Sequence, residues 1–274
     1  MKRKIVILTE GYTNPHFGKT ARNLIYYKPD EVVAIFDRNL AGKYVYEFLG
    51  VGKDIPIIGN LDEAQDANTL LIGVATGGGK ISNNYVEIIL QAIKKGWNII
   101  SGLHDFVSDI DVLVDEAKIS GSNIWDIRKN SFNKVVNRKG INDNCLRIQT
   151  VGNDCSLGKM VTSIEINKKL IEKGYKSKFV ATGQTGILIE GDGLPIDCIK
   201  GDFINGAAEQ LVLDNKNNDI MIIEGQGSLI HPRYSSVTLG LLHGALPHAL
   251  IMCYEMGRKN IIGFDNIFIP DLQE

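Results

Sequence analysis

The chain has 274 residues, of which 44% are hydrophobic and 23% are charged, and its formal net charge is −2. This length is long for a single hydrophobic core and suits two domains, while the near-neutral charge gives no electrostatic basis for binding nucleic acid or an anionic membrane. The apolar runs are too short for a signal peptide or a membrane span, and the four cysteines show neither a CxxC pair nor metal-ligand spacing.

Predicted strands and helices alternate through the first half of the chain. We expect strands at residues 4–8, 31–36, 55–58, 69–74, 98–100 and 123–127, and helices that end near Tyr27 and lie at 85–95 and 110–118, with a helical turn at 62–65. This alternation is typical of a parallel sheet with crossover helices. It predicts a Rossmann-like domain over residues 1–130.

The motifs of this first domain do not identify its ligand. Asp37 ends the second strand, as the ribose-binding acid of dinucleotide-binding folds does, but a helix-capping role explains it equally well. The first turn, Glu10 to Pro15, lacks the G-x-G-x-x-G fingerprint. The run Gly77-Gly78-Gly79 either approaches a ligand or makes a tight turn. We therefore assign no NAD site.

After a polar connection at residues 131–144, the alternation resumes over residues 145–274. Strands are expected at 145–151, 178–181, 220–223 and 249–253, and helices at 160–173, 202–213 and 237–243, with the start of another unit at 260–264. Ligands of open parallel sheets bind at the carboxyl ends of the strands, so the loops at 152–158, 183–186 and 224–231 should face one cleft. The chain stops abruptly after Ile267 to Asp271, and we expect a shortened form of a longer protein.

The most specific motif follows the first of these strands. It reads Gly152-Asn153-Asp154-Cys155-Ser156-Leu157-Gly158-Lys159, and a helix-period segment starts at Met160. This is the order of a phosphate-binding loop, in which backbone N–H groups surround an anion and the helix N-terminus and the lysine add positive charge. We predict that residues 152–160 bind the phosphates of a cofactor within a P-loop NTPase-like domain.

Two departures from the usual loop limit its chemistry. Five residues separate its glycines instead of four, as in the loop of dethiobiotin synthetase and its relatives, which this one resembles. Met160 stands where a hydroxyl normally ligates Mg²⁺, and Thr162, about 300° round the helix from Lys159, is a poor substitute. The loop is therefore expected to hold phosphate without ordinary Mg-nucleotide cleavage.

Three side chains near the predicted cleft are candidates for catalysis. Glu224 directly follows a buried strand and suits a general base or a metal ligand, with the alternative that it satisfies nearby loop N–H groups. His231 suits proton transfer, with the alternative that backbone contacts hold it. Cys155 lies in an electropositive loop that permits an acyl-cysteine, but no histidine partner can be placed beside it, which favours a packing role.

Neutral polar side chains suited to orienting a small polar substrate stand at the strand ends: Gln184, Thr185, Gln226 and Ser228. Asp202 opens the next predicted helix and is expected to cap it or to contact the substrate. No residue is assigned to a metal.

Five stretches of the chain resemble one known family. They are Gly102 to Phe106, Gly152 to Met160, Thr182 to Gly186, Gly201 to Glu209, and Glu224 to Pro232. They resemble the D-glutamate N-acetyltransferase-like proteins, a family long catalogued as a domain of unknown function and often labelled as epimerase/dehydratases. The resemblance implies a Rossmann-like domain followed by a P-loop domain, a Met160 that matches the family loop, and a further C-terminal segment that this chain lacks.

The resemblance also implies an activity, transfer of the acetyl group of acetyl-CoA to the amine of D-glutamate or a similar acidic amino acid. Lys159 and its loop would hold the CoA phosphates, Glu224 or His231 would take the amine proton, and the N–H groups of Gly225 to Ser228 would stabilise the oxyanion. Two alternatives stay open: an enzyme like dethiobiotin synthetase that uses ATP with Mg²⁺ bound by Glu224, and a non-catalytic nucleotide-binding sensor. We expect a cytoplasmic homo-oligomer that binds neither nucleic acid nor membrane.

Overall fold

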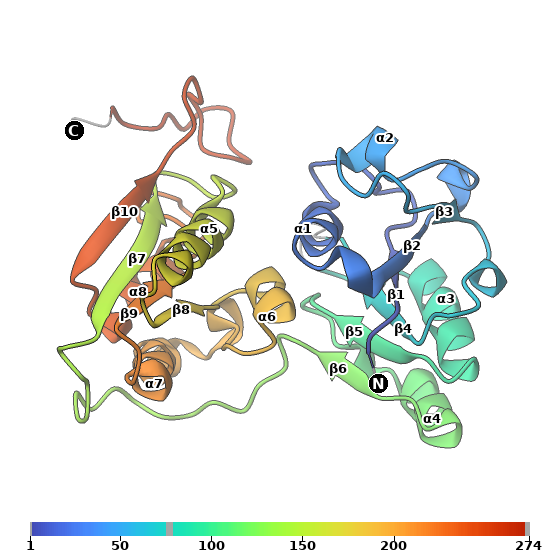
Figure 1. The fold of residues 1–274 in the computed structure, drawn as a ribbon, viewed down its shortest axis with the longest axis horizontal. Helices are drawn as coiled ribbons and strands as arrows, with labels where there is room; N and C mark the ends of the chain where they lie inside the picture. Colours follow the sequence, from blue (N-terminus) through green and yellow to red (C-terminus); the bar gives the residue numbers. More distant parts are fainter. Residues whose placement is uncertain (1, 75–78, 272–274) are drawn as a thin grey trace. The chain divides into compact units, whose positions relative to one another are not determined.

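The computed structural model of the protein describes residues 2–74 and 79–271. The chain divides into two compact units, Met1–Lys129 and Asn130–Glu274 (Figure 1). Each unit is built on one sheet of parallel strands with helices between them. The predicted class, α/β with two successive parallel-sheet domains, is confirmed.

The first unit holds a six-stranded parallel sheet in the order β3-β2-β1-β4-β5-β6. Its strands are β1 (Ile5–Leu8), β2 (Val32–Phe36), β3 (Ile57–Ile58), β4 (Thr69–Ile72), β5 (Asn98–Ser101) and β6 (Ile124–Asp126), and its α-helices are α1 (Lys19–Tyr27), α2 (Tyr46–Leu49), α3 (Asn83–Lys94) and α4 (Asp111–Ser120). The strand order reverses between β1 and β4, which is where doubly wound sheets bind ligands. In the glycine run predicted there, Gly77 and Gly78 lie outside the described residues.

The carboxylate of Asp37 organises the loop after β1. Asp37 is fully buried, and its Oδ2 accepts hydrogen bonds from Gly11 N (3.0 Å) and Thr13 Oγ1 (2.5 Å). Its Oδ1 accepts a further hydrogen bond from Asn39 N (3.1 Å), which caps the 3₁₀ turn Arg38–Leu40. Both carboxylate oxygens are therefore committed to the protein, which supports the capping interpretation over ribose binding.

The second unit holds a four-stranded parallel sheet in the order β10-β7-β9-β8. Its strands are β7 (Leu146–Gly152), β8 (Ser177–Val180), β9 (Ile220–Ile223) and β10 (Ala249–Cys253), and its α-helices are α5 (Lys159–Glu172), α6 (Gln184–Glu190), α7 (Ile204–Asn215) and α8 (Ser235–Ala245). Helix α5 packs against β7, β8 and β9, while α7 and α8 pack on each other (Figure 1). All four residues of β9 are buried, because helices cover both faces of such a sheet, and this explains its continuous apolar sequence.

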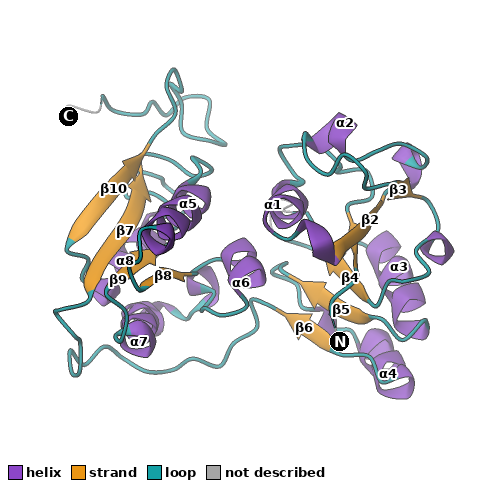
Figure 2. Cartoon of the chain, viewed as in Figure 1, coloured by secondary structure: helices purple, strands orange, loops and turns teal. Residues whose placement is uncertain are grey.

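The polar segment at residues 131–144 contains no helix or strand, as Figure 2 shows. The backbone N–H groups of Asn137 and Arg138 donate to the carboxylate of Glu209 on α7, at 2.9 and 2.8 Å, and Glu209 is 2% exposed. The carbonyl oxygen of Lys134 lies 2.0 Å from the position that a Cβ at Gly206 would take. The segment predicted as a connection is thus fixed along α7.

Three local predictions are wrong. Residues 184–186 were expected as a loop, but they form the first turn of α6, where Gly186 allows close packing against the next strand end. Asp202 does not cap α7: Phe203 holds the N-cap position, and Asp202 lies exposed in the 3₁₀ turn before it. Residues 260–264 form turns instead of starting a new α/β unit.

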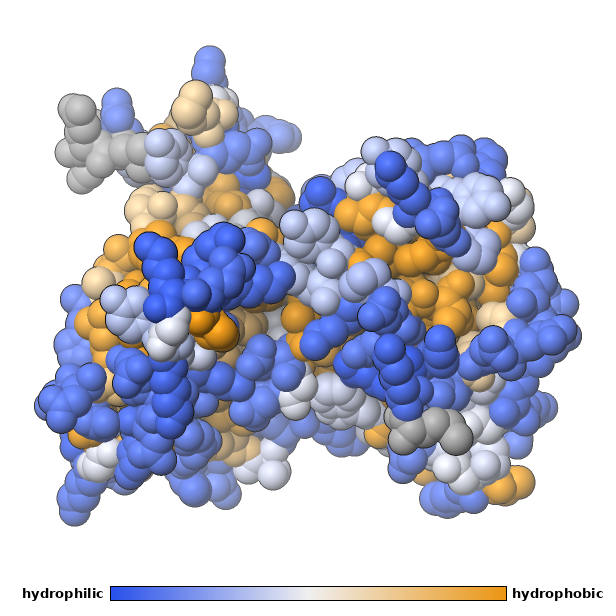
Figure 3. Space-filling view, viewed as in Figure 1, coloured by the Kyte–Doolittle hydropathy of each residue, from blue (hydrophilic) through white to orange (hydrophobic). Residues whose placement is uncertain are grey.

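No helix among the described residues is both long and apolar enough to cross a membrane. Apolar side chains nevertheless reach the surface beside β10 (Figure 3), where Leu250 is 53% and Met252 is 45% exposed. Leu250 and Met252 stand two positions apart on the edge strand β10, so their side chains lie on the same face of the sheet.

Replacing Asp37 by alanine tests its anchoring role. The substitution leaves three donors without their acceptor, so we expect the free energy of unfolding to fall by about 2–4 kcal/mol, measured by chemical denaturation. The control is Asp30→Ala, at an exposed position of the 3₁₀ turn Pro29–Glu31, which should change it by less than about 0.5 kcal/mol. Equal stability of the two variants would contradict the assigned role.

Candidate functional site

The loop between β7 and α5 forms an open cradle of backbone N–H groups. Two of its residues have positive φ, Ser156 (57°) and Gly158 (84°), and the second sits at the N-cap of α5. Within the described part of the chain, the N–H groups of residues 157–160 donate to no acceptor. Such a series of N–H groups at a helix N-terminus is suited to binding an anion.

The side chain of Asp154 fixes this loop from behind. It is fully buried, and its Oδ2 accepts hydrogen bonds from Arg258 Nη1 and Ile262 N, both at 2.9 Å. Its Oδ1 accepts the N–H of Cys155 at 2.6 Å. The negative charge is therefore bound to the C-terminal segment and does not enter the cradle, where it would repel phosphate.

The side chain of Lys159 lies buried at the loop. Its side chain is 6% exposed, and Nζ donates to the carbonyl oxygen of Asp154 at 2.8 Å. Burial lowers the pKa of this ammonium, and the neighbouring Cys155, Cys253, Asp154 and Glu224 oppose that shift. A bound phosphate would supply the negative charge that favours the ammonium.

Glu224 follows β9 and is 3% exposed. Its Oε2 accepts hydrogen bonds from Thr182 N (2.9 Å) and Gly183 N (3.1 Å), just after β8. Burial raises the pKa of Glu224 to about 7, while the two backbone hydrogen bonds and the Lys159 ammonium pull it downwards. A carboxyl group that titrates near neutral pH suits general base catalysis.

Close approaches at glycine bring three strand-end loops together around Glu224. A Cβ at Gly186 would lie 2.4 Å from Glu224 Oε2, and one at Gly183 would lie 2.3 Å from Gln226 Nε2. A Cβ at Gly225 would lie 1.8 Å from the carbonyl oxygen of Thr150 and 3.1 Å from Lys159 Cδ. The structure thus brings Lys159, Glu224 and Gln226 to one place.

The other predicted substrate residues are spread more widely. Gln184 and Thr185 form the first turn of α6, next to Gly183. Ser228 lies in the turn after β9 and is 1% exposed. The side chain of Asp202 is exposed and makes no hydrogen bond or ion pair within residues 2–74 and 79–271.

Two hydroxyl groups near the loop, those of Ser163 and Thr150, are hydrogen-bonded to each other and to the backbone. Ser163 Oγ is 2.9 Å from Lys159 O and 3.0 Å from Thr150 Oγ1, which in turn accepts the N–H of Gly225 (2.9 Å). Both hydroxyl side chains, of Ser163 and Thr150, are fully buried. These hydrogen bonds join α5, β7 and the residue that follows Glu224 after β9.

His231 is buried behind the loop and is held at both ring nitrogens. Arg233 N lies 3.2 Å from Nδ1, and the carbonyl oxygen of Ile262 lies 3.3 Å from Nε2. The ring also contacts the rings of Tyr234 and Phe264 and is 1% exposed. These contacts match the alternative stated for this residue, a histidine held by the backbone.

The environment of Cys155 corrects one premise. No histidine partner was expected beside it, yet ligand atoms of Asp154, Cys155 and His231 all lie within 4.8 Å of one another. The Asp154 oxygens in this cluster already accept hydrogen bonds from Arg258 and from main-chain N–H groups, so they are not free to bind a cation. The cluster acts as the anchor of the loop.

Two site residues were not predicted. Arg258 lies more than a hundred positions after the loop that it holds. No local sequence pattern therefore indicates its role. Gln149 interrupts the apolar strand β7, and that interruption was the available signal: it is fully buried, and its side-chain Nε2 and Oε1 have no hydrogen-bond partner in the described residues. Such unpaired buried groups are rare in native proteins.

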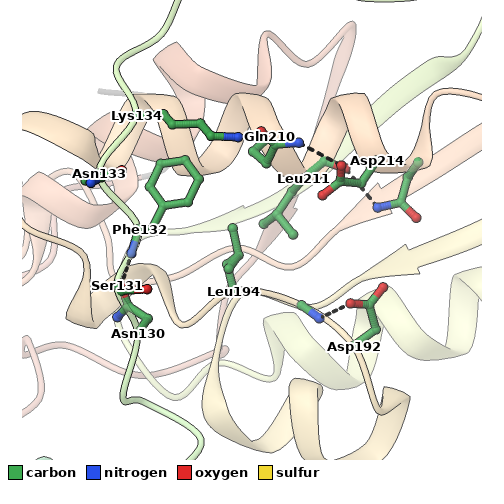
Figure 4. Close-up of a pocket in the computed structure, with 12 residues that line it drawn as sticks. Asn130, Ser131, Phe132, Asn133, Lys134, Asp192, Leu194, Gln210, Leu211 and Asp214 are labelled. Atoms are coloured by element: carbon green, nitrogen blue, oxygen red, sulfur yellow. Dashed lines mark hydrogen bonds between the residues drawn. The ribbon is translucent and has the colours of Figure 1, made fainter.

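The second unit also has a hollow of about 440 Å³, lined by both polar and apolar residues, away from these loops (Figure 4). It lies between the segment at 130–134, the turn at 192–194 and helix α7. Gln210 spans part of it by accepting from Lys134 Nζ (3.4 Å) and donating to Asp214 Oδ1 (2.7 Å). None of its lining residues belongs to the cradle or to the loops around Glu224.

Family models match both parts of the chain. One described as the P-loop domain of a domain of unknown function, DUF1611_C, matches residues 134–274. Its N-terminal counterpart, DUF1611_N, described as a Rossmann-like domain, matches residues 38–130.

Individual relatives are similar over most of the chain. A protein of Tritonibacter scottomollicae named D-glutamate N-acetyltransferase is 42% identical over 212 residues, which are 77% of this chain and 63% of that protein. A protein of a Pseudoalteromonas species with the same name is 43% identical over 207 residues, 76% of this chain and 62% of that protein. The chain therefore spans less than two thirds of the curated relatives it matches. A crystal structure of a DUF1611 family protein from Anabaena variabilis superposes with a TM-score of 0.92 at 37% identity, covering 98% of this chain and 79% of that one.

The raised pKa of Glu224 predicts a pH-dependent stability. The carboxyl group has a pKa of 4.5 when unfolded and about 7 when folded, so its stabilising protonated form is fully present below pH 4.5 and is lost as pH rises through 7. Glu224→Gln stays neutral and keeps an acceptor oxygen. We therefore expect the unfolding free energy of the variant minus that of the parent protein to increase by about 3 kcal/mol from pH 4 to pH 8, because only the parent loses stability as Glu224 ionises. Denaturant titration at each pH measures this difference. A difference independent of pH would rule out the shift.

Proposed function

The chain belongs to the DUF1611 family, and from that premise we propose that it is an N-acetyltransferase that moves the acetyl group of acetyl-CoA to the amine of a small acidic amino acid such as D-glutamate. The names of its two curated relatives support the reaction class. The observation in the chain itself that carries the proposal is an open N–H cradle with a buried lysine beside a buried carboxyl group whose pKa is about 7.

The cradle suits a phosphorylated cofactor that is bound but not cleaved at its phosphates. Acetyl-CoA carries a diphosphate and a 3′-phosphate, and it needs charge and N–H donors to hold them. Lys159 and the N–H groups of residues 157–160 offer both. Met160 brings no hydroxyl for Mg²⁺, which acetyl transfer does not require.

Glu224 is the proposed general base. It takes the proton of the substrate ammonium group, and the free amine then attacks the thioester carbonyl. A carbon–nitrogen bond forms, the carbon–sulfur bond breaks, and the CoA sulfur leaves and takes up a proton. Its pKa of about 7 leaves much of Glu224 ionised at neutral pH, and its burial keeps water away from the carboxylate.

The turn after Glu224 provides the donors proposed for the oxyanion. The N–H of Gly225 donates to Thr150 Oγ1 and is therefore not available to an oxyanion. The proposed donors are the N–H groups of Gln226, Gly227 and Ser228. Across the described ranges, the N–H groups of these three residues have no acceptor. Free N–H groups beside a base are the arrangement that stabilises a tetrahedral intermediate.

The ATP-dependent alternative has less support. It requires the Glu224 carboxylate to bind Mg²⁺, but its Oε2 already accepts two backbone hydrogen bonds, from Thr182 N and Gly183 N. The missing hydroxyl at Met160 removes a second ligand.

The activity is tested with purified protein, acetyl-CoA and a panel of D- and L-amino acids, by following CoA release and the mass of the product. We expect acetylation of an acidic amino acid, with kcat/KM that rises with pH and levels off above about 7, where Glu224 is ionised. Glu224→Gln should lower kcat by about 100-fold or more and abolish this rise. Cofactor binding without turnover of any amine would instead favour a sensor.

Lys159→Ala separates cofactor binding from chemistry. Loss of a charge-assisted hydrogen bond to phosphate should weaken acetyl-CoA binding by about 10- to 100-fold, measured by calorimetry. Lys169→Ala removes a charge from the exposed surface of the same helix and should leave affinity nearly unchanged. Full affinity in Lys159→Ala would overturn the assignment of the cradle to CoA.

A further inference from the structure

A largely apolar cavity of about 340 Å³ opens directly beside the phosphate loop. It begins at Gly152 and Asn153, the first two residues of the loop, and runs along the carboxyl ends of β7 and β10 towards α8. Apolar side chains such as Leu242 and Met252 make up most of its wall. Its volume is at the lower end of the range typical of small-molecule sites.

Buried polar atoms without partners border this cavity. Ser228 lines it and is 1% exposed, yet its Oγ has no hydrogen-bond partner among the described residues. The Oδ1 of Asn153, also in the wall, is buried and unpaired there as well. An unpaired buried polar group costs about 1–3 kcal/mol, so the two such groups in the cavity wall, on Ser228 and Asn153, indicate an absent partner.

The apolar wall continues onto the surface of the unit. Leu229 is 54%, Leu250 is 53% and Met252 is 45% exposed, and all three border the cavity. A contiguous apolar patch on a protein surface marks a binding site for an apolar group. The occupant is therefore mostly apolar, has a few hydrogen-bonding groups, and is connected to an anion in the neighbouring loop.

We propose that this cavity receives the pantetheine arm of the acyl-CoA donor, an inference that rests on the proposed function. The arm has methyl and methylene groups to cover the apolar wall and two amide groups that match the unpaired atoms. An amide carbonyl accepts from Ser228 Oγ, and an amide N–H donates to Asn153 Oδ1. The arm joins the diphosphate of CoA, and the cavity joins the loop proposed to hold it, at Gly152 and Asn153.

A pair of ligands tests the proposal: CoA, which has the arm, and adenosine 3′,5′-bisphosphate, which lacks it. Leu242→Trp fills the cavity and should weaken CoA binding by about tenfold or more while changing bisphosphate binding by less than about twofold, both measured by calorimetry. Ser228→Ala should weaken CoA alone, by about 2- to 10-fold. Leu239→Trp is the control, since Leu239 lies on the same helix, is 50% exposed and does not line the cavity.

Other results would overturn the inference. Equal losses for both ligands in Leu242→Trp would show damage to the cradle, and no loss for either would show an arm outside the cavity. A change in oligomeric state of Leu242→Trp by sedimentation, with CoA affinity unchanged, would assign the patch to a second copy of the chain. If the parent protein binds CoA and Lys159→Ala weakens that binding, each of these results contradicts the cavity proposal and leaves the proposed function intact. If the parent protein does not bind CoA, the proposed function itself is wrong.

Discussion

Three hydrogen bonds to the buried carboxylate of Asp154 determine the shape of the site. They come from Arg258, from the main chain at Ile262 and from Cys155 inside the loop, and they turn the one acidic side chain of the loop away from its N–H groups. The cradle therefore stays positive although an aspartate is part of its sequence. Because two of the donors come from the segment after β10, that segment is part of the site.

Burial around Glu224 has two opposing effects. The glycines at 183, 186 and 225 let three strand ends approach so closely that the carboxyl group is nearly inaccessible to water. This raises its pKa into the range useful for proton transfer and lowers stability at neutral pH. The same close packing brings Lys159 and Gln226 next to it. The site is thus closely packed where the proposed chemistry takes place, and unpaired atoms of Ser228 and Asn153 lie in the wall of the neighbouring cavity.

Much of the fold could be predicted from the sequence because its information is local. The apolar strand β9, the order of strand, glycine loop and helix around residues 152–159, and the position of Glu224 all follow from neighbouring residues. Helix α6 could not be predicted, because Gly183 and Gly186 read as a loop until the carboxylate of Glu224 packs against them. The proximity of Cys155 to His231 and the hydrogen bond from Arg258 to Asp154 join segments far apart in the chain, which no local pattern reveals.

Hydrogen–deuterium exchange with and without CoA reports on the N–H groups of the cradle themselves. If these groups hold the CoA phosphates, CoA slows exchange in peptides covering residues 155–161 and 226–230, with no change in helix α4 of the first unit. Bound CoA that leaves the N–H groups of residues 157–160 unprotected would contradict this prediction.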